Sequence, residues 1–447
     1  MSSAAAVAPR YEVEVAHQAL DSGLSSIILV GITVLLFLVP LCFGAVEPWA
    51  IFLFESACSL LSILWVVHQL RQGELRIVGS PLYRPMIAFA GLVLVQFISK
   101  QTANGVETVS EGLLYVAYGL LCFLTIQTLR RTNQLRTLAF STCIFSATLA
   151  IFALVQGLAP NGKLYWLRTP RFGGWIYGPY VNHNHYAGLM ELLVPIPIAV
   201  CLSRHVTRRN RILAASVAAI AGSTILLSGS RGGMVAFAGQ MVVLILFRGQ
   251  RPHGQRKLQW TVVAIAAIAF AVWAGGRDLA NRITTIPGEA KTELSGGTRI
   301  RIDRDALRMI ARKPILGWGL GTFGDIYPQF RTFPSDLVID KAHNDYVQLL
   351  VETGVLGFVV MLWFLVLTYR AAIRKLENAG GHANRELALA AIVGVTGILI
   401  HSFFDFNLQI PANAAWFYVL CAVAVMELDS THDHRRARRT ANHQVAC

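Results

Sequence analysis

The sequence predicts an all-α protein that crosses a membrane many times. Of its 447 residues, 54% are hydrophobic and only 14% are charged, and the mean hydropathy is +0.52. A soluble globule of this length needs more polar surface than such a composition supplies. The apolar residues also gather in runs near the roughly 20 residues with which an α-helix crosses a bilayer. Together these observations favour a polytopic membrane protein over a soluble enzyme.

Twelve apolar runs give the expected spans in chain order. They cover residues 25–44, 48–69, 82–99, 111–129, 136–158, 184–203, 211–228, 231–248, 258–275, 354–372, 386–405 and 411–427. Pro195 and Pro197 interrupt the sixth run. Because short spans and re-entrant segments look alike in a sequence, the expected number is about 12, with a margin of about one or two.

Basic residues predict on which side of the membrane each loop lies. Alternate loops, such as RRTNQLR and RHVTRRNR, and the tail HDHRRARR hold most of the Lys and Arg, and such loops are typically cytoplasmic. Both termini are therefore expected inside. The first span is expected to be an uncleaved signal anchor, because no small-residue cleavage pattern follows it. The net charge of +14 then calls for no nucleic acid, since basic loops facing anionic headgroups of the lipid bilayer account for most of it.

One long polar segment, residues 276–342, interrupts the apolar pattern. It carries eleven Lys or Arg on what this topology makes the outer face, which opposes the usual bias and points to an anionic ligand. It has none of the seven cysteines, so neither a disulfide framework nor a cysteine-based metal site is expected. The expected organisation is a cytoplasmic segment 1–24, a bundle of nine spans 25–275, a large outer loop 276–342, a bundle of three spans 343–427 and a basic cytoplasmic tail 428–447.

The loop before the sixth span is the first of three unusual outer segments. It begins RFGG at Arg171, and the span then opens with Asn182, His183, Asn184 and His185. Four consecutive hydrogen-bonding side chains at a span mouth favour a polar ligand, whereas the alternative is an asparagine that only caps the helix. A metal site is disfavoured, because histidines at this offset point in different directions on a helix.

The second segment is the turn LLSGSRGGMVAF, which places Arg231 at the membrane boundary. A guanidinium at that depth is costly unless it is paired or faces water. One interpretation is an arginine that snorkels to lipid phosphate. The other, which we favour, is a ligand-binding arginine whose flanking glycines let a large anion approach closely.

The third segment contains GGTRIRIDRDALRMIARKPILGWGLGTF and predicts an amphipathic helix on the outer membrane surface. Its polar face carries Arg304, Arg308 and Arg312, and its apolar face carries Leu307, Ile310 and Ala311. Arg299 precedes this helix and either reaches inward or stays outside. The match of GLGTFG to G-x-G-x-x-G is false, because no strand precedes it; its glycines instead predict a sharp turn.

The chain returns to the membrane through KAHNDYVQLLVETGVLGF, with His343, Asn344 and Asp345 at the mouth and Glu352 in the apolar run. A histidine takes up and releases a proton near neutral pH, and Asp345 or Glu352 is a candidate to orient or polarise it. The alternative is that Asn344 caps the helix beside a histidine of no chemical role.

These segments together suit a diphosphate that is held and then released. Arginine binds phosphate oxygens through bidentate, charge-assisted hydrogen bonds, and such contacts can replace a divalent metal in stabilising a departing charge. The sequence shows no carboxylate cluster of the kind that holds Mg²⁺ against a diphosphate. We therefore expect neither a metal nor any other cofactor.

Four blocks resemble the signature motifs of the O-antigen ligase and polymerase superfamily. They are GPYVNHNHYAG, the SRGG turn, TRIRIDRDALRMIARKPILGWGLGTF and AHNDYVQLLVETGVLG, and they occur in the family's order and spacing over about residues 170–360. The resemblance implies a GT-C-like membrane glycosyltransferase with a periplasmic site in the bacterial inner membrane. It further implies a metal-independent, inverting transfer of a glycan from undecaprenyl diphosphate to a sugar hydroxyl, on lipid A core or on another lipid-linked glycan.

The resemblance also assigns roles to matching residues. Arg231 and Arg299 would contact the diphosphate, and His343 would be the general base or would activate the acceptor hydroxyl. A second tier that lines or shapes the site would comprise Arg171, Asn182, Asn184, His185, Arg301, Arg304, Asn344, Asp345 and Glu352. The family often has an aromatic residue where Asp303 stands, which leaves the register of the arginine block open.

Several functions remain compatible with the sequence. A lipopolysaccharide ligase and an exopolysaccharide polymerase differ only in their acceptor, and a ligase that glycosylates proteins is a third relative. The alternative from another class is a non-enzymatic exporter or flippase of lipid-linked saccharide. Transporters commonly show paired broken spans and repeat symmetry, and the sequence indicates neither.

Overall fold

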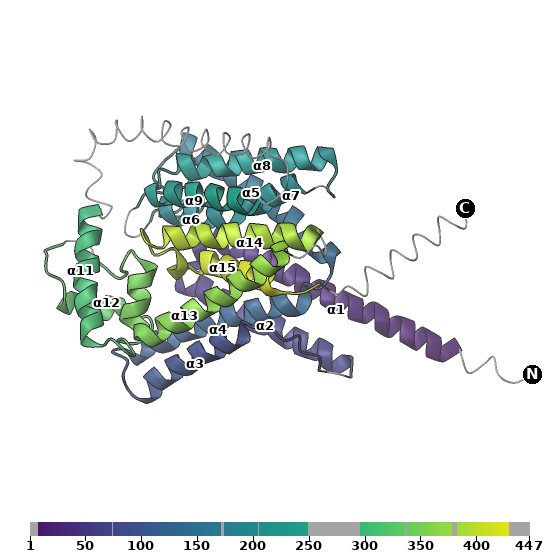
Figure 1. Ribbon diagram of the computed structural model, residues 1–447, viewed down its shortest axis with the longest axis horizontal. Helices are drawn as coiled ribbons and strands as arrows, with labels where there is room; N and C mark the ends of the chain where they lie inside the picture. Colours follow the sequence, from purple (N-terminus) through teal and green to yellow (C-terminus); the bar gives the residue numbers. More distant parts are fainter. Residues whose placement is uncertain are drawn as a thin grey trace, which may run out of the picture.

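The computed structural model describes residues 8–73, 75–170, 174–203, 205–248, 296–335, 338–377 and 382–428. Within these ranges the regular elements are helices, apart from two isolated bridges at Leu164–Arg168 and Tyr177–Tyr180. The helices are α1 (Ala8–Leu41), α2 (Pro48–Arg71), α3 (Tyr83–Ile98), α4 (Gly105–Thr128), α5 (Thr132–Leu158), α6 (His183–Leu193), α7 (Pro195–Leu202), α8 (Arg208–Leu227), α9 (Arg231–Arg248), α11 (Gly296–Arg312), α12 (Phe323–Ile326), α13 (Asp345–Glu377), α14 (His382–His401) and α15 (Pro411–Val425) (Figure 1). Short 3₁₀ turns lie at η1 (Phe43–Ala45), η2 (Tyr327–Gln329) and η3 (Asn407–Gln409). The all-α class predicted from the sequence is confirmed.

The helices also confirm a multi-pass membrane protein. In the part of the chain that the structure describes, eight helices are long and apolar enough to cross a bilayer, and α3, α9 and α15 are shorter apolar helices. All of them lie at runs expected from the sequence. The expected run 258–275 lies outside the described residues, so the number of twelve spans stays a prediction.

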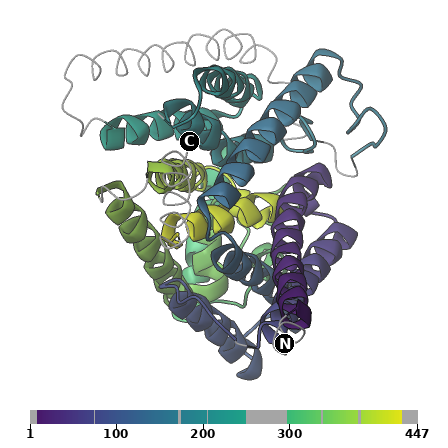
Figure 2. The same ribbon diagram turned by 90° about the vertical axis from the view of Figure 1, so that its right-hand side faces the viewer.

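The bundle is built around its last helices. α14 packs against α9, and α15 packs against α4; Figure 2 looks along the bundle and shows yellow α15 in its middle. All residues of α15 and of α6 are buried. In contrast, α1 to α3 carry exposed aliphatic and aromatic side chains, such as Phe52, Ile63 and Ile87. An apolar outer surface of this kind is what spans that face lipid require.

The sixth expected span is broken in two at its prolines. α6 ends at Leu193 and α7 begins at Pro195. Proline has no backbone N–H and its ring crowds the preceding turn, so it cannot continue the ladder of hydrogen bonds of α6. The break keeps its flanking bonds, because Val194 N donates to Met190 O at 2.8 Å and Ile198 N donates to Val194 O at 3.3 Å.

A second break separates the first turns of α13 from its long span. Gly354 has φ 64° and ψ −168°, a conformation open essentially to glycine. A Cβ there would lie 2.2 Å from the backbone oxygen of Ile315. The loop after α11 fills the gap: Val355 N donates to Pro314 O at 2.8 Å, and Gly319 N donates to Glu352 O at 2.9 Å. The start of α13, just after His343, is thereby held by this loop.

α11 lies across the ends of the bundle helices (Figure 1), as expected for a helix in the plane of a membrane surface. Of the apolar face expected for it, Ile310 packs against the protein, whereas Leu307 is 59% exposed and Ala311 is also exposed. The buried stripe is Ile302, Ala306 and Met309, which pack in a cluster with Phe323, Tyr327, Phe333, Ala342 and Val351. Hydropathy predicts the buried face from the residues of the helix alone, whereas the face that is buried in the structure is the one against which the following loop packs.

Candidate functional site

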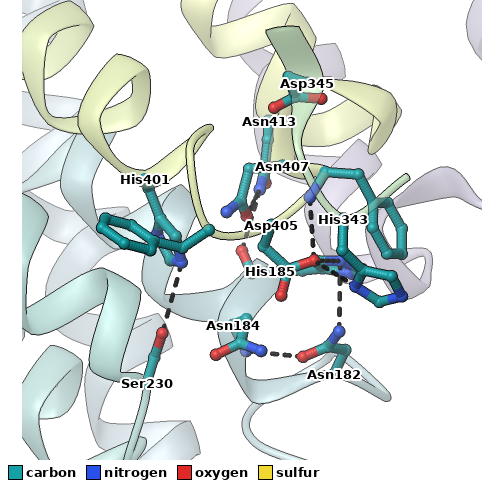
Figure 3. A network of polar contacts seen from close by, with 12 residues as sticks. Asn182, Asn184, His185, Ser230, His343, Asp345, His401, Asp405, Asn407 and Asn413 are labelled. Carbon is teal, nitrogen blue, oxygen red and sulfur yellow. Dashed lines mark hydrogen bonds and ion pairs between the residues drawn. The ribbon is translucent and has the colours of Figure 1, made fainter. Parts of the chain in front are cut away.

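The turn between α14 and α15, residues 402–410, gathers polar side chains from four helices at the end of the bundle where α11 lies. In Figure 3, His343, His185 and Asn182 lie together on one side of this network, and His401 with Ser230 lies on the other. We call residues 402–410 the α14–α15 turn. No single motif of the sequence predicted this meeting point.

Asp405 is the centre of the turn. Its carboxylate is buried, with Oδ1 3.2 Å from His343 Nδ1 and 3.8 Å from His185 Nε2. Its Oδ2 lies 3.5 Å from Arg299 Nη2. Burial by itself favours the neutral acid, but the nearby ring of His185, the hydrogen bond with His343 and the charge of Arg299 hold the pKa of Asp405 well below its usual range. Asp405 is therefore an anion around which the cationic and proton-carrying groups assemble.

His343 stands in the loop before α13 with its ring against Asp405. Its φ is +57°, in the left-handed region that non-glycine residues seldom adopt, so the surrounding contacts must hold it there. Nδ1 faces the carboxylate of Asp405. When Nδ1 carries the hydrogen of that bond, Nε2 has a free lone pair that can accept a proton. The ring edges of His343 and His185 both meet Phe406, with ring centroids 4.7 Å apart in each case.

Arg299 is the arginine of α11 that enters the site. Its Nη1 donates to the backbone oxygen of Phe404 at 2.6 Å, and its Nη2 reaches Asp405. Arg301 instead lies with Cζ 5.8 Å from the ring centroid of Phe333, and Arg304 is exposed. The sequence left open which of Arg299, Arg301 and Arg304 reaches the site. In the structure it is Arg299 that contacts the polar cluster.

Arg231 is the first residue of α9, and its helix begins against the same turn. A Cβ added at Gly232 would lie 2.7 Å from His401 Cδ2 and 3.1 Å from Phe404 Cβ. Phe404 thus separates the start of α9 from Arg299. Arg231 is exposed and forms no ion pair with any residue of the described ranges. Its guanidinium is free to meet an anion beside the amino end of a helix, where the backbone N–H groups and the helix dipole also favour negative charge.

Asp345 and Glu352 do not orient His343, in contrast to what the sequence suggested. Asp345 Oδ2 accepts from Ser402 Oγ at 2.7 Å and from the backbone N of Leu408 at 3.1 Å. Glu352 Oε1 accepts from Gln348 Nε2 at 3.0 Å. Asp345 therefore fastens the start of α13 to the α14–α15 turn, and the carboxylate that contacts His343 is Asp405.

Both asparagines that open a helix cap it. Asn182 Oδ1 accepts from Asn184 N at 2.8 Å and caps α6; its Nδ2 also lies 3.3 Å from His185 Nε2. Asn344 Oδ1 accepts from the backbone N of Tyr346 at 3.1 Å and of Val347 at 3.3 Å. Asn184 is buried in the first turn of α6. Arg171 lies outside the described residues.

Asp303 faces the site from the inner side of α11. Burial raises its pKa to about 6, although His343, Arg299 and a hydrogen bond with Asn344 act in the opposite direction. Its Oδ1 is buried and has no hydrogen-bond partner in the described part of the chain. The carboxyl group of Asp303 is thus a titratable neighbour of His343.

Two further carboxyl groups were not predicted from the sequence. Asp405 ends the eleventh apolar run, and Glu191 lies inside the sixth. Ionisable residues in apolar runs are costly and mark functional sites by default, so that signal was present in both runs. Glu191 Oε1 lies 2.8 Å from His401 Nδ1 in the interior of the bundle.

Fold and site together define a class: a membrane-embedded helical protein with a cluster of charged and polar side chains at one end of its bundle. Comparison with protein families narrows this class to one family. The model of the O-antigen ligase family matches residues 198–362, so the chain carries a domain of that family there. The resemblance stated above is confirmed. The family implies a glycosyltransferase-type enzyme that acts on lipid-linked glycans in a bilayer. A search of curated proteins found no match.

The family match includes only part of the site. Arg231, Arg299 and His343 lie inside residues 198–362. Asp405 and His185, which contact His343 or its partner, lie outside it. The fold therefore completes the matched domain with residues from both flanking parts of the chain.

Proposed function

We propose that the protein transfers a glycan from undecaprenyl diphosphate to a sugar hydroxyl at the periplasmic face, with inversion and without a metal. The acceptor is lipid A core or another lipid-linked glycan. The observation that carries the proposal is the position of Asp405, which contacts the candidate base His343 on one oxygen and the candidate diphosphate ligand Arg299 on the other.

In the proposed reaction His343 Nε2 takes the proton of the acceptor hydroxyl. The oxygen of that hydroxyl attacks the anomeric carbon on the face opposite the diphosphate, and the bond between this carbon and the diphosphate oxygen breaks. The bonding pair leaves with undecaprenyl diphosphate. Asp405 fixes the ring of His343 and stabilises the imidazolium, as the carboxylate of a Ser-His-Asp triad does for its histidine.

Arg231 and Arg299 are the groups that would receive the diphosphate. Charge-assisted hydrogen bonds from guanidinium groups to phosphate oxygens strengthen as charge develops on the leaving group. Among the residues that the structure describes, Arg231 forms no ion pair at the amino end of α9, and Arg299 donates to Phe404 O and reaches Asp405. Gly232, the neighbour of Arg231, and Arg299 both approach Phe404, which supports action of the two arginines on one ligand.

The two broken spans bear on the exporter alternative. In transporters, broken helices line a central cavity with their half-helix ends. Here the break at Gly354 is filled by backbone of the loop after α11, and the break at Pro195 keeps its flanking hydrogen bonds. Neither break leaves helix ends open to a substrate, which favours the enzyme.

The test is reconstitution of the purified protein with a lipid-linked diphosphate donor and alternative acceptors in the presence of EDTA. We expect product with one acceptor class, which separates ligase from polymerase, and no loss of rate with EDTA. His343→Ala should abolish transfer, with a loss of about 10²- to 10⁴-fold for a missing general base, while donor binding persists. Arg304→Ala, an exposed change on α11, is the control.

Wild-type transfer by His343→Ala would show that the base is another group. Donor translocation across the vesicle membrane without product would instead support the exporter. A rate that falls with EDTA and returns with a divalent cation would contradict metal independence.

A further inference from the structure

A second histidine–carboxylate pair lies inside the bundle and has no part in the proposed reaction. His401, the last residue of α14, has its Nδ1 2.8 Å from Oε1 of Glu191 on α6. The two side chains are 1% and 0% exposed. Such groups are costly in a membrane interior and are seldom kept there without a role. Because neither side chain is exposed, we look for its role in its neighbours.

The neighbour on the other side of His401 is the start of α9. His401 Nε2 lies 3.4 Å from Ser230 Oγ (Figure 3), and Ser230 Oγ accepts from Gly233 N at 3.1 Å. Ser230 thus caps the helix that begins with Arg231. The hydrogen-bonded chain from Glu191 to Ser230 joins α6, α14 and α9.

Packing holds the same helix start in place. The backbone of Gly232 lies directly on the imidazole ring, since an added Cβ would be 2.7 Å from His401 Cδ2 and 2.8 Å from Nε2. Lower on α9, Gln240 Nε2 donates to Glu191 O at 2.6 Å and to Val393 O at 3.1 Å. The orientation of Arg231 therefore depends on where His401 lies, and His401 is held by Glu191.

His401 also leads directly into the α14–α15 turn. Ser402, the next residue, binds Asp345, and Asp405 binds His343. A shift of His401 would thus move the start of α9 relative to the turn that holds the base. The pair connects the two halves of the site, one for the diphosphate and one for proton transfer.

We propose that His401 and Glu191 form a positioning pair that sets Arg231 for the diphosphate of the donor. The inference rests on the proposed function, in which Arg231 contacts that diphosphate. Arg231 already contacts the diphosphate in the bound donor, so its displacement raises the donor KM, and kcat falls as well to the extent that the contact strengthens during the reaction. The acceptor, on the side of His343, should bind unchanged.

The experiment uses the reconstituted enzyme and the lipid diphosphate donor. Glu191→Gln keeps the size of the side chain and one acceptor oxygen but removes the charge. His401→Asn keeps a donor near the place of Nδ1 but does not reach Ser230. We expect each to raise the donor KM about tenfold, as changes in coupled contacts commonly do, with little change in the acceptor KM. In an Arg231→Ala background, neither change should raise the donor KM further.

The matched control is Tyr369→Phe. It removes a hydroxyl of α13 that lies 2.7 Å from Thr396 Oγ1. Thr396 is on α14, like His401, but this contact does not involve the start of α9, so the donor KM should stay as it is. Ser230→Ala gives a milder second test, because it removes only the contact between His401 and the cap of α9. Should Glu191→Gln or His401→Asn fail to accumulate in membranes, the donor KM of Ser230→Ala decides.

Two results are distinguishable. If Arg231→Ala raises the donor KM but the changes at Glu191, His401 and Ser230 do not, or if they add to Arg231→Ala in full, the positioning pair is overturned. If Arg231→Ala itself leaves the donor KM unchanged, the assignment of Arg231 in the proposed function has failed instead.

Discussion

The two histidine–carboxylate pairs at the end of the bundle use the same chemical groups in opposite surroundings. The His343 side chain is 14% exposed and stands in a loop with a strained backbone, beside Arg299. The His401 side chain is 1% exposed and ends a helix, with one nitrogen toward Glu191 and the other toward Ser230. Among the described residues, the first ring forms a hydrogen bond through Nδ1 alone, whereas the second has both nitrogens engaged within the protein.

This difference shows that burial and the partner of the second ring nitrogen, and not the pairing itself, separate a candidate base from a candidate positioning group. The α14–α15 turn starts at one pair and contains the carboxylate of the other. If substitutions in the two pairs had the same kinetic effect, the pairs would not differ in role. If one pair mainly affected kcat and the other mainly the donor KM, the difference in role would be supported.

The largest contrast is expected from Asp405→Asn. The amide cannot stabilise the imidazolium and can hold the ring of His343 in the wrong tautomer, and an equivalent change in a Ser-His-Asp triad lowers kcat about 10⁴-fold. We expect kcat to fall by about 10²- to 10⁴-fold with a smaller change in donor KM. Steady-state kinetics beside Glu191→Gln measure it, and the comparison breaks if both variants lose kcat equally.

Arg299→Ala should give the next largest effect. It removes charge-assisted hydrogen bonds to the diphosphate, each worth about 1.5 to 3 kcal/mol, so donor affinity should fall by roughly 10- to 100-fold. Arg304→Ala on the same helix, whose side chain is exposed, is the matched control and should bind the donor normally. Equal losses for both arginines would mean that general surface charge, and not the inward position of Arg299, attracts the donor.

Gly232→Ala tests the second pair by crowding it. The new methyl group would meet His401 and the Cβ of Phe404, neither of which can move aside easily, so we expect the donor KM to rise several-fold. Gly239→Ala on the same helix meets only the flexible end of Ile400 and should have little effect. A donor KM that is unchanged in Gly232→Ala would show that Arg231 tolerates displacement of its helix.

The smallest effect concerns Asp303, next to the first pair. Its pKa in the folded protein is about 6 and about 4 when unfolded, so the folded state binds more protons between these values and ionisation of Asp303 above pH 6 disfavours folding. Asp303→Asn should therefore raise the Tm above about pH 6, and the gain should vanish below about pH 4. Thermal unfolding of the detergent-solubilised protein over this pH range measures it. A gain that stays constant with pH would contradict the titration of Asp303.

Hydropathy was enough to predict the class of the protein, because each membrane span is a run of consecutive apolar residues. The amphipathic helix and the interruption at Pro195 were likewise local and were predicted, but Arg299, expected before that helix, lies inside α11. The partner of His343 was not, since Asp405 is 62 residues away and sits at the end of an apolar run, where it looked like a span boundary. The covered face of α11 also escaped prediction, because it depends on a loop that returns from Phe323 to Ala342.

The path of the loop through the break at Gly354 has a consequence for chimaeric proteins. Backbone hydrogen bonds join the loop after α11 to α13, and the close contact leaves no room for a side chain at Gly354. Arg299, on the α11 helix before this loop, contacts the turn before α15. A segment with Arg299 and His343 that is exchanged alone between two relatives would lack the α14–α15 turn that both residues contact. Donor and acceptor specificity should therefore be grafted as a unit that contains residues 296–410, so that modular exchange follows the contacts and not the boundaries of the matched domain.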